Sequence, residues 1–173
     1  MHTPGPAAAK HLTFTLEHDT YGVDILCVRE IRRWSRLTRL PQAPDYLPGI
    51  LSLRGAPVPV MDLRRRFGLP AGEYDDQTVL VILDLDGQPL GLIVDAVTGV
   101  EEIVAGQVHP VPEDGAVVDR EYLTGLADGH GQMIMLLAPE RLLHANACPA
   151  DSDTADDGTC NPHREATDVE LTF

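Results

Sequence analysis

The sequence predicts a mainly β protein made of two small, five-stranded β-barrel lobes with short helices. Short segments in which apolar and polar residues alternate recur along the chain, which is the period of half-buried strands. None of these segments is followed by a long crossover helix, so the strands should pair antiparallel. Residues 46–67 also align without gaps on residues 122–143, which indicates two lobes of related shape.

The first elements are expected to be two strands and a helical turn. Apolar residues alternate with threonine over residues 12–16, and the alternation resumes over 21–25 after a turn at 18–20. From Leu26 onward the apolar spacing lengthens to that of a helix, with recurrences at Cys27, Ile31 and Trp34. We therefore expect a short helix or turn after the second strand.

The middle of the chain predicts two hairpins. An apolar strand at 50–53 is broken by Arg54-Gly55, and a second strand follows over 58–60. Residues 78–85 are almost continuously apolar, which is typical of a strand that is buried on both faces. Asp86-Gly87 then supplies a two-residue hairpin turn before the partner strand.

The last elements are expected to be a hairpin and a closing helix. Strands at 122–126 and 132–138 flank a turn at 128–131. Pro139 stands where proline is favoured, at the first position of a helix that should run to Ala145.

The internal repeat predicts shared turns that carry different side chains. Between the two copies, identical residues occur at 46/122, 47/123, 49/125, 55/131 and 65/141. Because shared glycines mark shared backbone requirements, Gly55 and Gly131 should occupy equivalent turns. Beside them the first copy has Arg54 and the second has His130, so the lobes should bind different surfaces.

Composition suits one globular unit with an extension at each end. The chain has 173 residues, of which 43% are apolar and 23% charged. Residues 1–10 are expected to be a flexible leader, 11–145 the folded domain, and 146–173 a disordered acidic tail. The beginning of the chain lacks a secretory signal, and three irregularly placed cysteines do not form a disulfide framework. We expect a cytoplasmic protein.

Charge is strongly segregated along the chain. The net charge is −14, yet nine of the thirteen basic residues lie within residues 29–66, which carry +6. This segment could steer an acidic partner, or its arginines could simply be solvated. A third possibility is a barrel that binds nucleic acid through residues 29–66, although no aromatic residues alternate with the arginines to stack on bases.

No catalytic motif is evident, and one group of residues could bind a metal. The sequence lacks a glycine-rich phosphate loop, a Gly-x-Ser-x-Gly elbow and a His-Glu-x-x-His pair. The residue types of a zinc site occur at His144, Cys148, Cys160 and His163, but their spacing matches no standard finger. A metal-binding or hydrolytic protein that uses this 144–163 cluster is therefore the alternative to a binding module, and we predict no catalytic residue and no metal site.

The most informative stretch is residues 49–67, GILSLRGAPVPVMDLRRRF. It places Arg54 at the mouth of a hairpin-like turn, where a planar guanidinium suits docking through forked hydrogen bonds. The stretch resembles the signature of the CheW family of chemotaxis coupling proteins, which runs roughly NLRG, a few variable residues, a proline-valine pair and DLR. Ser52 stands where that signature commonly has asparagine, and Ala56-Pro57 replaces a branched pair.

The resemblance extends in order over residues 11–145. It is carried further by Tyr21-Gly22-Val23-Asp24-Ile25, Val28-Arg29-Glu30-Ile31, Leu40-Pro41, Pro44-Asp45-Tyr46, Gly91-Leu92-Ile93-Val94-Asp95 and Tyr122-Leu123-Thr124-Gly125-Leu126. Several linked motifs of this kind are more specific than a single match.

The resemblance implies a fold and a function. The fold is two intertwined lobes of the SH3-like barrel type. The function is that of a non-catalytic adaptor without a cofactor, which couples the cytoplasmic tip of methyl-accepting chemoreceptors to the regulatory domain of a CheA-type histidine kinase. The protein would then be cytoplasmic and recruited to receptor arrays at the membrane.

Candidate partner-binding residues follow from the same resemblance. The implied receptor-contacting residues, near a groove between the lobes, are Glu30, Ile31, Gly49, Arg54 and Val79. We expect the kinase to bind mainly at other surfaces, and the candidate contact is the hairpin around Leu90, Gly91 and Leu92.

Overall fold

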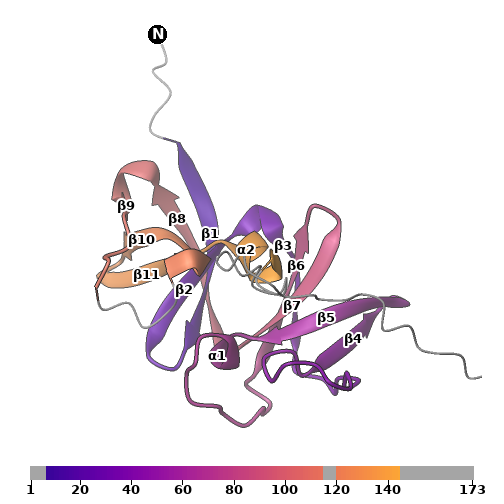
Figure 1. Cartoon of the computed structure of the whole chain (residues 1–173). Coiled ribbons are helices and arrows are strands. Elements are labelled where there is room, and N and C mark those ends of the chain that lie inside the picture. Colours follow the sequence, from indigo (N-terminus) through magenta and orange to yellow (C-terminus); the bar gives the residue numbers. More distant parts are fainter. Residues whose placement is uncertain (1–6, 115–119, 145–173) are drawn as a thin grey trace, which may run out of the picture.

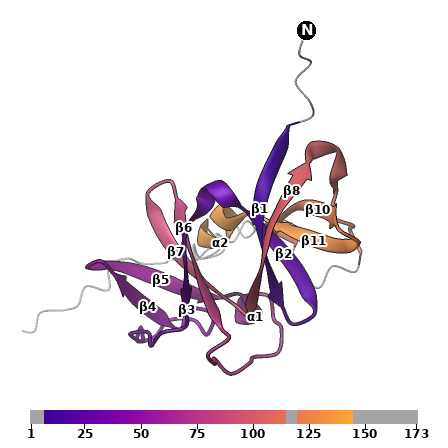
Figure 2. The same cartoon turned by 180° about the vertical axis from the view of Figure 1, so that it is seen from behind.

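A computed structural model describes residues 7–114 and 120–144 and confirms a mainly β protein with two sheets that form two lobes (Figure 1; Figure 2 from behind). The Arg54 lobe is a five-stranded sheet in the order β3-β6-β7-β5-β4. Its strands are β3 (Val28–Arg33), β4 (Gly49–Leu53), β5 (Ala56–Asp62), β6 (Val79–Leu85) and β7 (Gln88–Val94). The short helix α1 (Leu63–Arg66) follows β5 directly.

The His130 lobe is a sheet in the order β8-β1-β2-β11-β10-β9. Its strands are β1 (Ala8–Leu16), β2 (Asp19–Asp24), β8 (Ala96–Val104), β9 (Val108–His109), β10 (Leu123–Gly129) and β11 (Gln132–Leu137). The helical turns η1 (Ile25–Cys27), η2 (Ala105–Gln107) and η3 (Arg120–Tyr122) connect strands, and α2 (Pro139–His144) follows β11. In the described part of the chain, no helix has the length and apolar content that a membrane crossing would need.

The lobes are intertwined because the chain changes sheets twice. The β1–β2 hairpin begins the His130 lobe, β3 to β7 build the Arg54 lobe, and β8 to β11 return to complete the first sheet. The strands pair antiparallel as expected, except that each sheet contains one parallel pair, β2 with β11 and β5 with β7, so the expectation of purely antiparallel sheets is wrong. The Arg54 lobe is therefore one continuous stretch of chain, and the His130 lobe is assembled from the two stretches that flank it.

Both sheets curl, and the segment after β3 reaches the opposite edge of the Arg54 lobe. Thr38 and Ile50 exchange backbone hydrogen bonds of 2.9 and 2.8 Å, which join this segment to β4. In the His130 lobe the two-residue strand β9 pairs with β10 in the same way, so that this sheet has six strands where five were expected.

Burial divides the apolar residues into three clusters. The largest lies between the lobes and takes residues from both sheets, while a smaller cluster fills the interior of each lobe. Strand β6 serves two clusters: Val81 and Leu83 belong to the shared core, and Leu80 and Ile82 to the interior of the Arg54 lobe. This double burial explains the continuous apolar run that the sequence shows at 78–85.

The repeat is confirmed at the level of the backbone. Gly55 and Gly131 have φ angles of 81° and 83°, and the preceding residues Arg54 and His130 have 51° and 49°. Both hairpins thus turn through two residues in the left-handed region, which is the geometry of a type I′ turn. Outside the turns, the amide of Asp62 donates to the carbonyl of Tyr46, and the equivalent bond between Ala138 and Tyr122 has the same length, 2.8 Å.

Replacing either turn glycine should have the same cost. We expect Gly55→Ala and Gly131→Ala each to lower the free energy of unfolding by about 1–2 kcal/mol, because a Cβ is disfavoured at positive φ. Neither added Cβ would meet an atom within 4 Å, so backbone strain is the whole effect. Gly106→Ala is the control, since it too has open space but no positive φ. Urea denaturation measures all three, and clearly unequal losses at positions 55 and 131 would contradict equivalent turns.

One expectation about the chain is confirmed only in part, and another is wrong. A short helical turn follows the second strand as expected, but it ends at Cys27, and the residues that follow form β3. The register of β3 against β6 shifts between Val28 and Glu30, so the alternation typical of a strand is lost in the sequence. The expected leader is also too long, because β1 begins at Ala8 and Lys10 pairs with Glu102. Residues 1–6 and the expected tail, 146–173, lie outside the described residues.

Candidate functional site

Glu30 and Arg54 are brought together from the two edge strands of one sheet. Glu30 lies on β3, and Arg54 occupies the turn between β4 and β5. Curling of the sheet brings the edges close enough for Arg54 Nη2 to donate to Glu30 Oε2 at 3.4 Å. The other carboxylate oxygen of Glu30 lies 3.7 Å from Arg32 Nε. The arginine is thus oriented from one side by the carboxylate.

The ion pair is exposed and contributes little to stability. The Arg54 side chain is 75% exposed and that of Glu30 is 24% exposed. Exposed pairs of this kind typically contribute about 0–1 kcal/mol, because water and salt screen the charges. Its contribution is geometric, since most of the guanidinium remains free to bind a partner.

The other implied receptor contacts do not all join this pair. Ile31 is 47% exposed, and it pairs with Val81, whose side chain faces the core between the lobes. Paired residues point to the same face of a sheet, so Ile31 faces the junction of the lobes together with Val79, two residues along β6. Glu30 pairs with Ile82 and points to the opposite face, toward the interior of its own lobe.

Gly49 has a structural role. It is buried, and a Cβ built there would fall closer than 3.0 Å to the carbonyl oxygen of Thr38. Glycine thus allows the segment after β3 to approach β4 and form the bridge at Thr38. Gly125 is its counterpart in the repeat, where a Cβ would press against Val108 and His109 of β9.

The candidate kinase contact is buried and needs correction. Leu90 and Leu92 have exposed fractions of 1% and 0%, and both belong to the core between the lobes. Gly91 lies under Val60, whose Cγ2 would be 3.1 Å from an added Cβ. The residues that this hairpin exposes are Asp84 and those of its turn, residues 86–88. The apolar pattern predicts a strand here, but it does not distinguish residues that face a core from residues that face a partner.

The equivalent turn of the His130 lobe presents different chemistry. His130 is exposed, and its Nδ1 lies 3.7 Å from Glu101 Oε2 on β8. Strand β8 corresponds to β3, so each lobe sets a basic turn residue against a carboxylate on its outer strand. Of these two turns, only the one at Arg54 carries a planar guanidinium that can donate forked hydrogen bonds. This agrees with the expectation that the lobes bind different surfaces.

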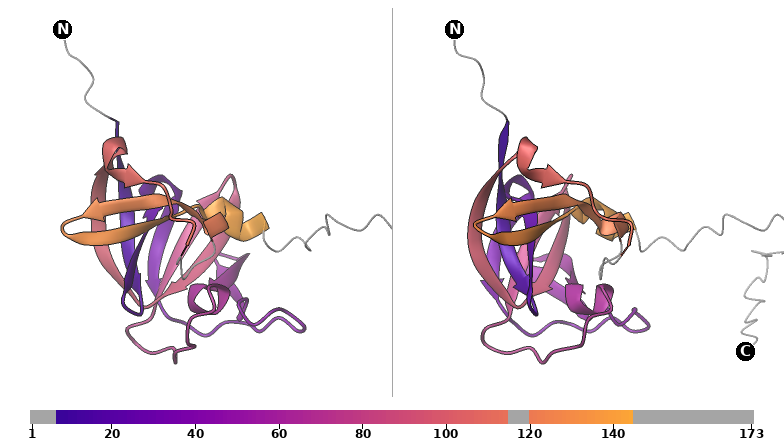
Figure 3. Two further views of the ribbon diagram at one scale, coloured as in Figure 1. Left: turned by 60° about the vertical axis from the view of Figure 1, so that its left-hand side comes forward. Right: turned by 90° about the vertical axis from the view of Figure 1, so that its left-hand side faces the viewer.

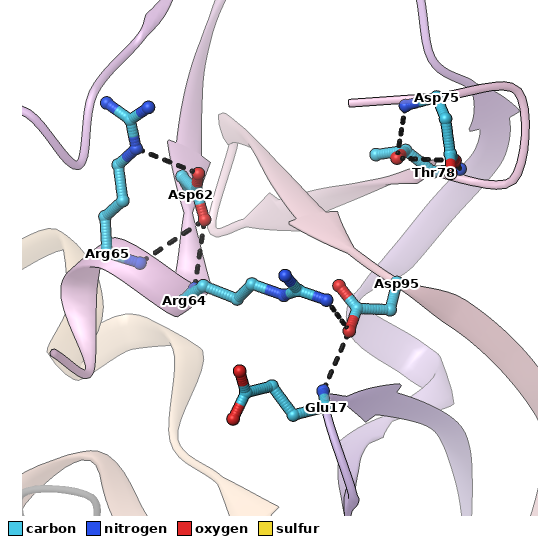
Figure 4. Close-up of polar contacts among 7 residues, drawn as sticks. All are labelled: Glu17, Asp62, Arg64, Arg65, Asp75, Thr78 and Asp95. Atoms are coloured by element: carbon cyan, nitrogen blue, oxygen red, sulfur yellow. Dashed lines mark hydrogen bonds and ion pairs between the residues drawn. The ribbon is translucent and has the colours of Figure 1, made fainter. Parts of the chain in front are cut away.

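Two carboxylates near α1, the buried Asp62 and the partly exposed Asp95, are engaged in structural contacts (Figure 4). Asp62 is 3% exposed and accepts hydrogen bonds from the amides of Arg64 and Arg65 at the start of α1 and from the hydroxyl of Tyr74, the last at 2.5 Å. Burial and this hydrogen bond raise the pKa of Tyr74 well above its usual value. Asp95 accepts from the amide of Glu17 and from Arg64, which raises the pKa of the Arg64 guanidinium.

The contacts of Asp95 hold the segment in which the chain crosses from the Arg54 lobe to the His130 lobe. Asp95 lies between β7 and β8, and its amide donates to Thr15 of β1 at 3.1 Å. Arg66 is the last residue of α1. Its guanidinium carbon lies over the rings of Tyr46 and Tyr122, at 4.4 and 4.9 Å from their centroids. Tyr46 and Tyr122, which are equivalent in the two copies of the repeat, thus contact the same arginine. These contacts connect the two lobes.

Metal chemistry finds little support in the described residues. Within 7–114 and 120–144, no three histidine, cysteine, aspartate or glutamate side chains gather as a metal site would require. The side chains of the 144–163 cluster lie outside what the structure describes. Cys27 is half-buried, and burial is the main reason that the pKa of its thiol is raised, which disfavours the reactive thiolate.

These features define a class of protein before any comparison: a two-lobed β scaffold with an oriented arginine at an exposed turn. A family model described as CheW-like domain matches residues 10–147. The chain belongs to this family and is a chemotaxis scaffold protein.

Individual relatives agree. The chain is 40% identical over 132 residues to the chemotaxis protein CheW of Klebsiella aerogenes, covering 76% of this chain and 80% of the relative. It is 33% identical to CheW of Rhizobium meliloti, covering 75% and 89%. Its structure is similar to the crystal structure of the scaffolding protein TtCheW from Thermoanaerobacter tengcongensis, with a TM-score of 0.71, 33% identity and coverage of 80% and 89%. The metal-binding and nucleic-acid alternatives are not favoured by these matches.

Proposed function

We propose that this protein is a non-catalytic cytoplasmic adaptor that couples methyl-accepting chemoreceptors to a CheA-type histidine kinase. Membership of the family supports the general role, and one observation carries the proposal for this chain. Arg54 is held at a rigid two-residue turn, oriented by Glu30 from one side, and otherwise exposed. A preoriented guanidinium loses less conformational freedom on binding, so more of its hydrogen-bond energy appears as affinity.

The receptor contact would involve two neighbouring surfaces. Arg54 and Glu30 would bind polar groups of the receptor tip, and Ile31 with Val79 would supply apolar contact at the junction of the lobes. Gly49 would act indirectly, by allowing the segment after β3 to approach β4. The surrounding arginines would raise the association rate with an acidic surface, because residues 29–66 carry +6.

The kinase contact would lie elsewhere on the Arg54 lobe. We assign it to the exposed turn 86–88 at the end of the β6–β7 hairpin, in place of the buried Leu90, Gly91 and Leu92. This arrangement would leave the Arg54 turn free, so that receptor and kinase could bind at the same time, as an adaptor requires.

Reconstitution tests the adaptor function. We expect the kinase to be activated by receptor-containing membranes only when the 173-residue chain is added, with a maximum at an intermediate concentration because excess adaptor separates its two partners. The control is the same titration with Asp86→Lys/Gln88→Glu, which should retain receptor binding and lose kinase binding. Full activation without the protein, or catalytic turnover by the protein alone, would contradict the proposal.

A further inference from the structure

A pocket opens within the segment that joins β3 to β4. Its volume is about 450 Å³, which lies within the roughly 300–1,000 Å³ range of ligand sites. Its walls come mainly from residues 34–48, with Arg65 of α1 and Tyr74 closing one side. Figure 3 shows α1 and the segments without regular structure at the same end of the molecule. The proposed receptor and kinase contacts do not use this pocket.

An aromatic pair forms a firm wall of the pocket. The rings of Trp34 and Tyr74 lie 4.3 Å apart between centroids. Tyr74 is held in place by its hydrogen bond to the buried Asp62, and Trp34 by the bond from its amide to the carbonyl of Thr78 at 3.0 Å. Leu37 and Leu40 also line the pocket. Together these residues offer a preformed surface for an apolar side chain.

The pocket is also positively charged. Arg36 and Arg39 line it and are exposed, and no ion pair engages either of them among the described residues. Arg65 is the third cation, although Asp62 lies 3.4 Å from its Nε. Against these, Asp45 is the one carboxylate that lines the pocket. Two free guanidinium groups beside an aromatic wall suit an acidic peptide that carries an apolar side chain.

We propose that this pocket binds the acidic segment 151–173 of the same chain. The segment contains seven acidic residues and one basic residue, and Val169, Leu171 and Phe173 could supply the apolar contact. Charge complementarity selects it, because residues 29–66 carry +6 and this segment, with seven acidic residues and one arginine, carries −6. The bound segment would occupy the pocket and neutralise Arg36 and Arg39.

The connection is long enough for this contact. The described chain ends at His144, and residues 145–173 follow. A chain of this length spans at most about 100 Å when fully extended. A folded domain of this size has a radius of gyration of about 14 Å, so the pocket is within reach. Tethering gives an effective concentration on the order of millimolar, so a weak contact suffices.

The 173-residue chain permits a direct test, because Trp34 is the one tryptophan in its sequence and gives a single indole N–H signal. A nitroxide label is attached at Cys160 in a Cys27→Ala/Cys148→Ala background, and paramagnetic broadening of the indole signal is measured by NMR. We expect this signal to lose most of its intensity at low salt. It should recover in 1 M NaCl, where the Debye length is about 3 Å. The matched variant Arg36→Gln/Arg39→Gln should also restore it at low salt.

Each alternative outcome overturns the proposal. An unbroadened indole signal, or equal broadening over the whole surface, would mean that the segment does not occupy the pocket. Broadening that persists in the double arginine variant would remove the charge argument. Broadening in a mixture of labelled ¹⁴N and unlabelled ¹⁵N protein would assign the contact to a second copy. Receptor and kinase are absent from this experiment, so its result is independent of the adaptor function.

Discussion

Arg54→Ala is expected to weaken binding to a chemoreceptor cytoplasmic fragment by about 1–3 kcal/mol, or about 5–150-fold, the usual range for losing hydrogen bonds to a charged group. Binding to the regulatory domain of the kinase should change little, because turn 86–88 lies on another hairpin. The fold should be preserved, since the side chain is 75% exposed and makes one long ion pair. Titration of the variant against each partner separately measures both effects.

Four further variants test separately the charge of Arg54, the geometry of its guanidinium and the lobe that binds the receptor. Arg54→Lys should rescue only part of the affinity, because a point charge cannot reproduce a planar fork. Arg54→Asn removes the charge with a residue that tolerates φ near 51°, so its loss should match that of alanine if the guanidinium is what binds. Glu30→Gln should weaken binding less than either, by releasing the orientation of the fork. His130→Ala, at the equivalent turn, should leave receptor affinity unchanged.

The outcome can contradict the proposal in two ways. Equal losses against receptor and kinase would mean that Arg54 supports the fold as a whole. Unchanged receptor affinity in both Arg54→Ala and Arg54→Asn would remove Arg54 from the site.

Asp62→Ala is expected to lower the free energy of unfolding by about 3 kcal/mol. The substitution removes three hydrogen bonds at about 1 kcal/mol each, two that cap α1 and one from Tyr74. The substitution should also affect the pocket. Tyr74 and Arg65 both line it and both contact Asp62, so both should become more mobile. Urea denaturation with an unchanged slope measures the stability change.

Tyr74→Phe and Asp62→Asn locate the source of that effect. Tyr74→Phe removes one of the three bonds and should cost about 1 kcal/mol. Its effect should nearly vanish in the Asp62→Ala background, because the partner is already gone. Asp62→Asn keeps an oxygen that can cap α1 and should cost less than alanine. Additive losses in the double variant would show that the Tyr74 hydroxyl and Asp62 stabilise the fold independently.

Several features could be predicted from the sequence because they depend on local rules. The hairpin turns at Arg54-Gly55, Asp86-Gly87 and His130-Gly131 all have positive φ, as their residue types predict. The double burial of β6 follows from its continuous apolar run, and the relation between the lobes follows from the glycines that they share. Arg54 could be singled out because it is the one arginine among these turn residues.

Other features depended on tertiary contacts that no local pattern encodes. Strand β3 is defined by its pairing with β6, and a register shift removes the period that would have revealed it. The sequence also does not determine which strands pair to form the two intertwined sheets, because several pairings would fit the same apolar patterns.

The same limit applies to the candidate sites. Leu90 and Leu92 could not be assigned to a core or to a binding surface by their apolar character, and only the position of the other lobe buries them. Glu30 and Ile31 point to opposite faces because they are neighbours on β3, a strand that its pairing with β6 defines. The meeting of Glu30 with Arg54 follows from the curl of the sheet. By itself the sequence determined which residues can turn, pair or carry charge. Which of them meet was decided by tertiary packing, because contacts between distant segments depend on how whole strands pack rather than on neighbours along the chain.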